Sequence, residues 1–236
     1  MNTAIIVAAG SGQRFNSDTP KQFVPLLGKP LIFHTLEKFE SCDRIDGIVL
    51  VLSDECRELF ESSNLKSEIT KLRSVVTGGS TRAESVRNGL STLDANDGDI
   101  VAVHDGARPL VTVDEIARTV EKAAETGAAC LVAPVTDTIK TIRGDEIAGT
   151  LERDKLRRAL TPQAFKFEVL KRAFEQSDLS EAVTDECYLV EKLGHPIVFV
   201  EGSSRNIKVT RPEDLVFAEA LLSAGVSSPH VSKVST

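Results

Sequence analysis

The sequence predicts an α/β protein built on a doubly wound, mostly parallel sheet. Two observations support this fold class. Apolar runs alternate with helical patterns along nearly the whole 236-residue chain, and such alternation is typical of parallel sheets with helical crossovers. The runs are also almost continuous in β-branched residues, as in strands that are covered on both faces. In these folds ligands bind beyond the carboxyl ends of the strands, so functional residues are expected there.

Strands are expected in seven segments, namely 3–9, 47–53, 73–77, 99–105, 129–135, 196–202 and 206–210. Three helix starts between them have the Ser/Thr-x-x-Glu spacing of a capping box; they lie at 81–84, 112–115 and 210–213. Gly127 is expected to end the helix that starts at 112–115, because glycine readily adopts the left-handed conformation common at helix ends.

Residues 136–160 interrupt the alternation, since they lack the long apolar stripe of a core helix. Arg143-Gly144-Asp145 suits a tight turn, so a hairpin is expected. A two-stranded hairpin is only marginally stable alone and needs a partner surface. It fits either a solvated β-arm or an arm that packs on a second subunit. Residues 1–225, with the arm included, are expected to form a single domain, followed by a disordered polar tail at 226–236.

Composition narrows the function classes. A net charge of −7 disfavours a nucleic-acid partner, because the phosphate backbone would be repelled, so any phosphate binding must be local. Four scattered cysteines without a CxxC pair indicate buried thiols in a reducing compartment rather than disulfides or a zinc site. No apolar run approaches the ~20 residues of a membrane span, and no basic leader precedes the first strand. We therefore expect a cytoplasmic protein.

A glycine-rich loop, "AAGSGQRFNSDTPKQF" at residues 8–23, follows the first expected strand. A P-loop needs Lys and then Ser or Thr directly after its last glycine, but Gly12 is followed by Gln13 and Arg14. A dinucleotide fingerprint needs a third glycine where this chain has Phe15. The loop therefore matches neither of the two common phosphate-binding templates.

The same loop nevertheless has the parts of an anion site. Its small residues would let a ligand approach the backbone closely; they are Ala8, Ala9, Gly10 and Gly12. Arg14 and Lys21 would supply positive charge for phosphate oxygens. The plainer alternative is a strand-to-helix turn with solvated cations, and the density of glycine and cations behind a buried strand favours the anion site.

Two further polar clusters lie at strand ends. In "HDGARP", Asp105 could meet a metal or a hydroxyl and Arg108 a phosphate, although an Asp-Gly pair is often only a turn. In "GGSTRAES", Gly78 and Gly79 precede a helix whose N-terminal amides could face a ligand. Ser85 lies one turn inside that helix.

Weaker candidates lie further along the chain; they are Thr138, Lys140, Thr161, Thr184 and Lys208. Lys208 also fits a lysine that extends from a strand into solvent. The four histidines show no metal-ligand spacing, and no GxSxG motif supplies an acyl-transfer serine. Cations and backbone amides at several strand ends suit phosphoryl or nucleotidyl transfer, in which positioning and charge neutralisation dominate catalysis.

The opening loop resembles the signature of sugar-nucleotide-type nucleotidyltransferases, a Rossmann-like fold. Together with "GGSTRAESV", "VHDGARP", "PVTDTIK", "LTPQAF", "TDE" and "GSSRNIKVTRPEDL", it resembles the 2-C-methyl-D-erythritol 4-phosphate cytidylyltransferase family from about residue 3 to residue 222. The resemblance implies transfer of the cytidylyl group of CTP to that sugar phosphate, with release of pyrophosphate, in non-mevalonate isoprenoid synthesis. Leu160 departs from the polar Gln of many relatives.

The resemblance also assigns residues. It implies Arg14, Lys21 and Lys208 as catalytic residues, and Ala8, Ala9, Gly10, Gly12, Gly79 and Ser85 as CTP-binding residues. On the substrate side it implies Asp105, Arg108, Thr138, Lys140, Arg153, Thr161, Thr184 and Lys208. Mg²⁺ would be held mainly by the CTP phosphates, with Asp105 as a candidate ligand. The 136–160 arm would form a homodimer and deliver Arg153 into the neighbouring site.

Two rival functions stay open at this point. A ribitol-5-phosphate cytidylyltransferase would share most of these motifs, but its relatives tend to lack a lysine at the position of Lys140. A non-catalytic nucleotide-binding regulatory protein could use the same fold. It would not need both Arg14 and Lys21 at an α-phosphate.

Overall fold

The computed structural model describes residues 1–10, 15, 19–179 and 183–224. Its centre is a seven-stranded sheet with the strand order β11-β7-β10-β6-β1-β4-β5. The strands are β1 (Asn2–Val7), β4 (Gly47–Leu52), β5 (Leu72–Thr77), β6 (Ile100–Asp105), β7 (Ala128–Pro134), β10 (Arg157–Lys166) and β11 (Val198–Glu201). All pair in parallel except β10, which is antiparallel to both β6 and β7. The mostly parallel sheet is thus confirmed.

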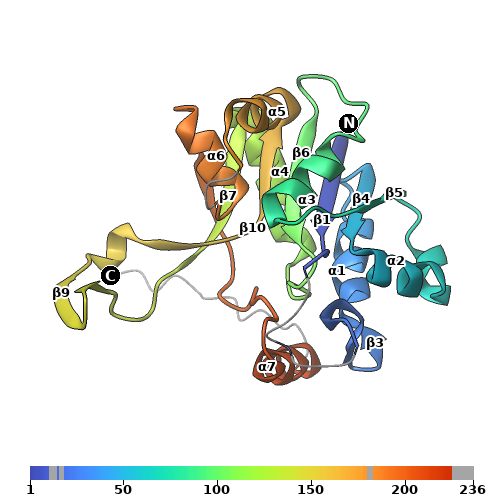
Figure 1. The fold of residues 1–236 in the computed structure, drawn as a ribbon, viewed down its shortest axis with the longest axis horizontal. Coiled ribbons are helices and arrows are strands. Elements are labelled where there is room, and N and C mark those ends of the chain that lie inside the picture. Colours follow the sequence, from blue (N-terminus) through green and yellow to red (C-terminus); the bar gives the residue numbers. More distant parts are fainter. Residues whose placement is uncertain (11–14, 16–18, 180–182, 225–236) are drawn as a thin grey trace, which may run out of the picture.

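Helices cover both faces of the sheet (Figure 1). One apolar cluster packs Ala4 and Ile6 of β1 against α1 (Leu31–Glu40), α2 (Asp54–Glu61) and α4 (Val113–Thr126). The other packs Ile5 against α3 (Arg82–Leu90), α5 (Phe167–Gln176) and α6 (Glu186–Lys192). Alternate residues of one strand therefore enter opposite layers, which explains the continuous apolar runs of the sequence.

Smaller elements complete the described chain. A two-stranded sheet of β2 (Pro25–Leu26) and β3 (Lys29–Pro30) lies near α7 (Pro212–Ser223). Short 3-10 helices are η2 (Lys21–Phe23), η3 (Asn64–Glu68) and η4 (Arg153–Lys155). No helix of the described chain is long and apolar enough to cross a membrane. The four cysteines are free and buried, as expected.

Most of the expected elements are confirmed, but two expectations about strands were wrong. Residues 206–210 form no strand; Val209 only donates from its backbone to the Ala107 carbonyl, at 2.8 Å. Strand β10 was missed, and its first residues had been assigned to the arm. Pro162 stands where the β10–β7 register shifts, between Ala159 and Gln163. Proline disfavours a central strand because it cannot donate a hydrogen bond to its neighbour, but it is tolerated at such an irregularity.

The helix ends largely follow the sequence signals. Thr81 and Thr112 form the two expected capping boxes, and Gly127 ends α4 with a left-handed φ of 91°. The third expectation was wrong by one residue, because Asp214 rather than Glu213 accepts from the backbone amides of Thr210 and Arg211. The N-cap is Arg211 and the first helical residue is Pro212, because proline is favoured at the first position of a helix.

The interruption in the alternation is a hairpin, as expected. Strands β8 (Lys140–Arg143) and β9 (Glu146–Thr150) pair in antiparallel fashion around Gly144, whose φ is 59°. The arm projects from the body of the molecule (Figure 1) and exposes 74% of Ile142 and 69% of Ile147. The expected limit at 160 is corrected, because Arg157 already pairs with Pro134 in the main sheet. The tail at 226–236 lies outside the described residues.

Candidate active site

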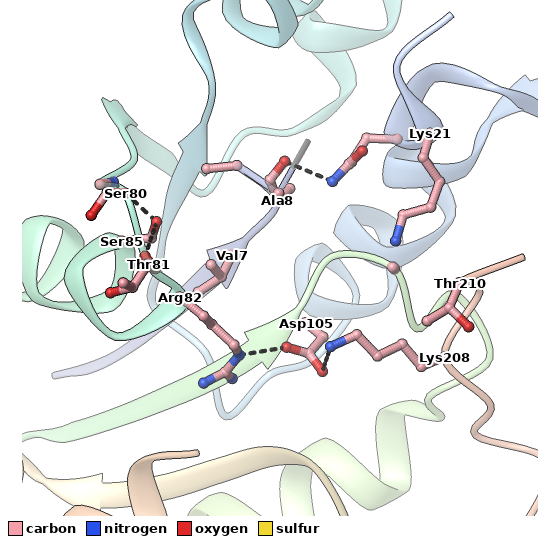
Figure 2. A pocket seen from close by; sticks show the side chains of 15 residues that line it. Val7, Ala8, Lys21, Ser80, Thr81, Arg82, Ser85, Asp105, Lys208 and Thr210 are labelled. Atoms are coloured by element: carbon pink, nitrogen blue, oxygen red, sulfur yellow. Dashed lines mark hydrogen bonds and ion pairs between the residues drawn. The ribbon is translucent and has the colours of Figure 1, made fainter. Parts of the chain in front are cut away.

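A pocket of about 740 Å³ opens at the carboxyl ends of β1 and β6 (Figure 2). The chain runs from β1 outward through β4 and β5, then returns to the other side of β1 at β6. This reversal is the topological switch point at which open α/β sheets bind ligands. The pocket is lined by Val7, Ala8, Ala9, Gly10, Lys21, Gln22, Gly79, Ser80, Thr81, Arg82, Ser85, Asp105, Ala107, Lys208 and Thr210.

The loop after β1 contributes small residues and a cation. Ala8, Ala9, Gly10 and Lys21 all line the pocket, whereas Gly12 and Arg14 lie outside the described residues. The neighbouring Gln22 is buried and its Nε2 donates to the Ala8 carbonyl at 2.8 Å. This side chain therefore holds the backbone of the loop, a role that the sequence did not reveal.

The loop before α3 packs tightly on the loop after β1. A Cβ at Gly78 would lie 2.3 Å from the Cβ of Ala9 and 2.9 Å from the Ser85 Oγ, so the approach requires glycine. Ser85 Oγ accepts from the Gly79 amide at 3.1 Å and donates to the Thr81 carbonyl at 2.9 Å. Ser85 thus shapes the wall of the pocket through the Gly79 loop.

Asp105, the last residue of β6, is the centre of charge in the pocket. Its Oδ1 is 2.9 Å from Arg82 Nε, and its Oδ2 is 2.9 Å from Lys208 Nζ and 3.3 Å from Arg108 Nε (Figure 2 shows the first two). Burial alone would raise the pKa of Asp105, but Arg82, Lys208 and Arg108 outweigh it and hold the pKa well below its usual range. Asp105 is therefore ionised near neutral pH.

Sequence reasoning missed Arg82, which lines the pocket, and Glu186, which lies behind it and pairs with Arg82. Arg82 Nη1 donates to Glu186 Oε1 at 2.6 Å, while its Nε donates to Asp105. Burial would lower the pKa of Arg82, but Glu186 and Asp105 raise it above its ordinary value. Burial raises the pKa of Glu186 despite the arginine. The available signal was an arginine in the first turn of a helix that follows two glycines; nothing in the sequence pointed to Glu186.

Thr161 lies behind Asp105 rather than in the pocket wall. It is 4% exposed, and its Oγ1 accepts from the Asp105 amide at 3.1 Å and lies 3.0 Å from His104 Nδ1. Burial lowers the pKa of His104 to about 3. Arg108 Nη1 donates to the Asn206 carbonyl at 2.9 Å, two residues before Lys208. Thr184 is exposed and outside the lining.

Three expected substrate residues lie on the arm and do not line the pocket of their own chain; they are Thr138, Lys140 and Arg153. Lys140 Nζ donates to Thr150 Oγ1 at 2.7 Å, and Arg153 Nη1 donates to the Thr136 carbonyl at 2.9 Å. The arm stands away from the switch point (Figure 1). The described chain therefore assembles its pocket without these residues.

The described side chains of the pocket do not form a metal-binding site by themselves. Within the described ranges no group of three or more His, Cys, Asp or Glu side chains could hold an ion. Asp105 is the single carboxylate among the described lining residues, and both of its oxygens already meet cations. Such a pocket fits a divalent cation that is carried mainly by phosphate oxygens.

The fold and the basic pocket at its switch point define an α/β enzyme of the nucleotidyltransferase class. The chain belongs to the 2-C-methyl-D-erythritol 4-phosphate cytidylyltransferase family, whose family model matches residues 2–224.

Relatives and solved structures agree with this membership. The chain is 43% identical to the cytidylyltransferase of that name from Halalkalibacterium halodurans, over 93% of this chain and 96% of the relative. It is 41% identical to that of Geobacillus thermodenitrificans, over 95% and 98%. The structure of 4-diphosphocytidyl-2C-methyl-D-erythritol synthase from Anaerococcus prevotii superposes with a TM-score of 0.82 at 30% identity, covering 94% of this chain and 96% of that one.

Proposed function

We propose that the chain is the cytidylyltransferase that joins CTP to 2-C-methyl-D-erythritol 4-phosphate, giving 4-diphosphocytidyl-2-C-methyl-D-erythritol and pyrophosphate in isoprenoid synthesis. Family membership over residues 2–224 supports the reaction. The observation that carries the site is the pocket at the switch point, where Arg82 and Lys208 pair with Asp105. Lys21 and two loops of small residues line the same pocket.

The reaction needs charge neutralisation more than it needs a base. An oxygen of the substrate phosphate, already anionic near neutral pH, attacks the α-phosphorus of CTP in line. The new P–O bond forms as the bond to the β-phosphate oxygen breaks, and pyrophosphate leaves with that electron pair. Two anions must approach, so fixed cations lower the barrier. We assign this role to Lys21 and Lys208, which line the pocket, and to Arg14.

CTP is assigned to the two loops that meet at Gly78. Ala8, Ala9, Gly10 and Gly79 line the pocket with small residues that let a ligand approach closely, and Ser85 holds the second loop in place. Gly12 would extend the same wall. A divalent cation such as Mg²⁺, held mainly by the CTP phosphates with Asp105 nearby, would neutralise part of the triphosphate charge.

The sugar phosphate is assigned to the Asp105 side of the pocket. Asp105 can accept from a sugar hydroxyl, and Lys208 supplies charge for the phosphate. Arg108 and Thr161 contact Asp105 directly, so they support this side. Thr184 precedes the capping residue of α6 and would close the same side of the pocket.

We further propose a homodimer made through the arm. The exposed Ile142 and Ile147 supply an apolar surface, and a hairpin of this size needs a partner. A second copy would bring Thr138, Lys140 and Arg153 to a pocket that is assembled without them in their own chain. The buried free thiols suit a cytoplasmic location.

The test is a pyrophosphate-release assay with CTP, Mg²⁺ and one sugar phosphate at a time. Methylerythritol phosphate should support turnover, and ribitol 5-phosphate should support at least tenfold less. Lys208→Ala should remove most of the activity, whereas Lys66→Ala, which alters a surface ion pair with Glu61, should not. Faster turnover with ribitol 5-phosphate would identify that compound as the substrate instead. If neither sugar phosphate released pyrophosphate, the chain would be a nucleotide-binding protein without this activity.

A further inference from the structure

A buried carboxylate lies just behind the pocket and has no role in the chemistry described above. Glu186, the first residue of α6, has a fully buried side chain. Its Oε1 receives a hydrogen bond from Arg82 at 2.6 Å, whereas its Oε2 has no hydrogen-bond partner among the described residues. Burying a carboxylate with one oxygen unsatisfied opposes folding, so packing alone does not account for a glutamate at this position.

The position of this carboxylate is fixed because the start of α6 is bound to the central sheet. Gln163 of β10 donates through Nε2 to Asp185 Oδ2 at 2.9 Å and accepts through Oε1 from the Cys187 amide at 3.0 Å. Asp185 in turn caps the Tyr188 amide at 2.9 Å. The start of α6 is therefore bound to the central sheet on both sides of Glu186, which makes this glutamate a rigid anchor.

Arg82 connects this anchor to the pocket. Two different nitrogens of its guanidinium meet two carboxylates, Nε at Asp105 Oδ1 and Nη1 at Glu186 Oε1. Because Arg82 takes Oδ1, Oδ2 is left to Lys208 at 2.9 Å and to Arg108 at 3.3 Å. If Glu186 lost its charge, Asp105 alone would have to pair with Arg82, Arg108 and Lys208. Arg82 could then claim both oxygens in a forked pair and displace the lysine.

We propose that Glu186 is a positioning residue for the transfer reaction: it fixes Arg82, and through Arg82 it keeps Asp105 and Lys208 in the arrangement that receives the sugar phosphate. This inference rests on the proposed function for its kinetic consequence. Its structural consequence stands independently, because it concerns contacts within the unliganded chain.

The kinetic test compares Glu186→Gln, which keeps the size of the side chain, with Glu191→Gln, an exposed glutamate of the same helix. We expect Glu186→Gln to raise the KM for methylerythritol phosphate at least tenfold, with the KM for CTP changed less than threefold. Loss of folded enzyme alone would lower kcat and leave both KM values unchanged. That outcome would overturn the proposal.

A double variant tests whether the effect passes through Arg82. If it does, adding Glu186→Gln to Arg82→Gln should change the KM for the sugar phosphate less than twofold, because the link is already cut. Additive effects would contradict the proposed path.

A crystal structure of Glu186→Gln supplies a readout that needs no turnover. We expect the Arg82 guanidinium to turn and pair with both oxygens of Asp105, and Lys208 to separate from Oδ2. If all three side chains superpose on the present arrangement, the proposal is wrong even if the enzyme is active. If the wild-type enzyme fails to turn over while these side chains move, the proposed function fails and the positioning role survives.

Discussion

Single residues set the electrostatics of the pocket, because each charge is placed by a strand end or a helix start. Asp105 ends β6 and faces three cations, so the pocket holds a fixed negative centre within a positive wall. Lys21 follows Pro20 at the start of η2 and lines the same pocket. Preorganised charges of this kind act on a transition state without needing to reorganise.

Replacing Lys21 should test the role at the α-phosphate that we propose for its charge. We predict that Lys21→Ala lowers turnover of CTP roughly a hundredfold or more in the presence of Mg²⁺, as the loss of one preorganised contact can. The fold should stay intact, because Lys21 is only partly buried. Steady-state pyrophosphate release measures the effect, with circular dichroism as the control for folding. A wild-type rate would refute the role of Lys21.

His104 should make stability depend on pH. Burial lowers its pKa from 6.5 to about 3, so the unfolded chain binds a proton first as the pH falls below 6.5. The free energy of unfolding should therefore decrease by about 2 kcal/mol between pH 7.5 and pH 5 through this group. Asp105 contributes only at lower pH, because its depressed pKa leaves it ionised in this window.

Urea unfolding at pH 7.5 and at pH 5 measures this dependence. His104→Asn should be less stable at pH 7.5 but should lose less stability on acidification than the wild type. His195→Asn, which replaces a half-buried histidine outside the pocket, is the matched control and should keep the wild-type dependence. Equal slopes for His104→Asn and the wild type would show that another group is responsible.

At the scale of elements, the pocket depends on how two loops meet. The loop after β1 and the loop before α3 touch at Gly78, where no Cβ fits. The capping box of Thr81 and Glu84 fixes where α3 begins, and Ser85 ties the Gly79 amide to the helix. The shape of this wall of the pocket, to which we assign CTP, therefore follows from backbone geometry rather than from a large side chain.

Gly78→Ala should disturb this contact. The new methyl group would lie 2.3 Å from the Cβ of Ala9, so one loop must move, and overpacking of this kind typically costs about 1–3 kcal/mol. We expect the KM for CTP to rise about tenfold, in the range that 1–2 kcal/mol of lost binding gives. Gly98→Ala is the control, since nothing lies within 4 Å of its Cβ position. Equal effects of the two variants would exclude a specific role for the loop contact.

Base selection should depend on the same loops. In the site that we propose, backbone and small polar groups near Ala8, Gly10 and Ser85 would pair with the polar edge of one base, and a different base would leave them unpaired. We predict a strong preference for CTP over UTP and ATP, measured as the ratio of kcat/KM values. Comparable activity with UTP would reopen a broader sugar-nucleotide specificity.

At the scale of the whole molecule, the arm is a hairpin whose apolar side chains stay exposed in a single chain. It stands off the body, exposes Ile142 and Ile147, and carries Arg153 away from the pocket of its own chain. Closed symmetric dimers are the commonest assembly that would bury such a surface. Arg153 could then meet the sugar phosphate bound by the partner, a charge-assisted contact.

Mixing two inactive variants tests this arrangement. Arg153→Ala and Lys21→Ala should each be nearly inactive alone, while a mixed dimer holds one site with both residues intact. After subunit exchange, activity should recover to at most about a quarter of the wild-type value, since half of the dimers are mixed and half of their sites are intact. Each variant alone at the same total concentration is the control. Sedimentation must confirm mixed dimers, and no recovery in their presence would place Arg153 at its own chain's site.

The sequence alone determined those features that depend on neighbours along the chain. β-Branched runs predicted six of the seven strands of the main sheet, and capping signals at Thr81 and Thr112 predicted two helix starts. Both kinds of signal act over a few residues. The glycine-rich loop and Asp105 could be predicted as site residues because both lie at the ends of expected strands, and parallel strands bring their carboxyl ends to one edge of the sheet.

Only the tertiary structure decided the features that join distant segments. β10 enters the centre of the sheet against the direction of its neighbours, and the stability of such pairing lies in partners that no local pattern reveals. Ion pairs at the pocket also join distant segments: Glu186 is 104 residues from Arg82. A buried charge is stable only beside its counter-charge, so the roles of Arg82 and Glu186 became visible only when the fold had brought them together.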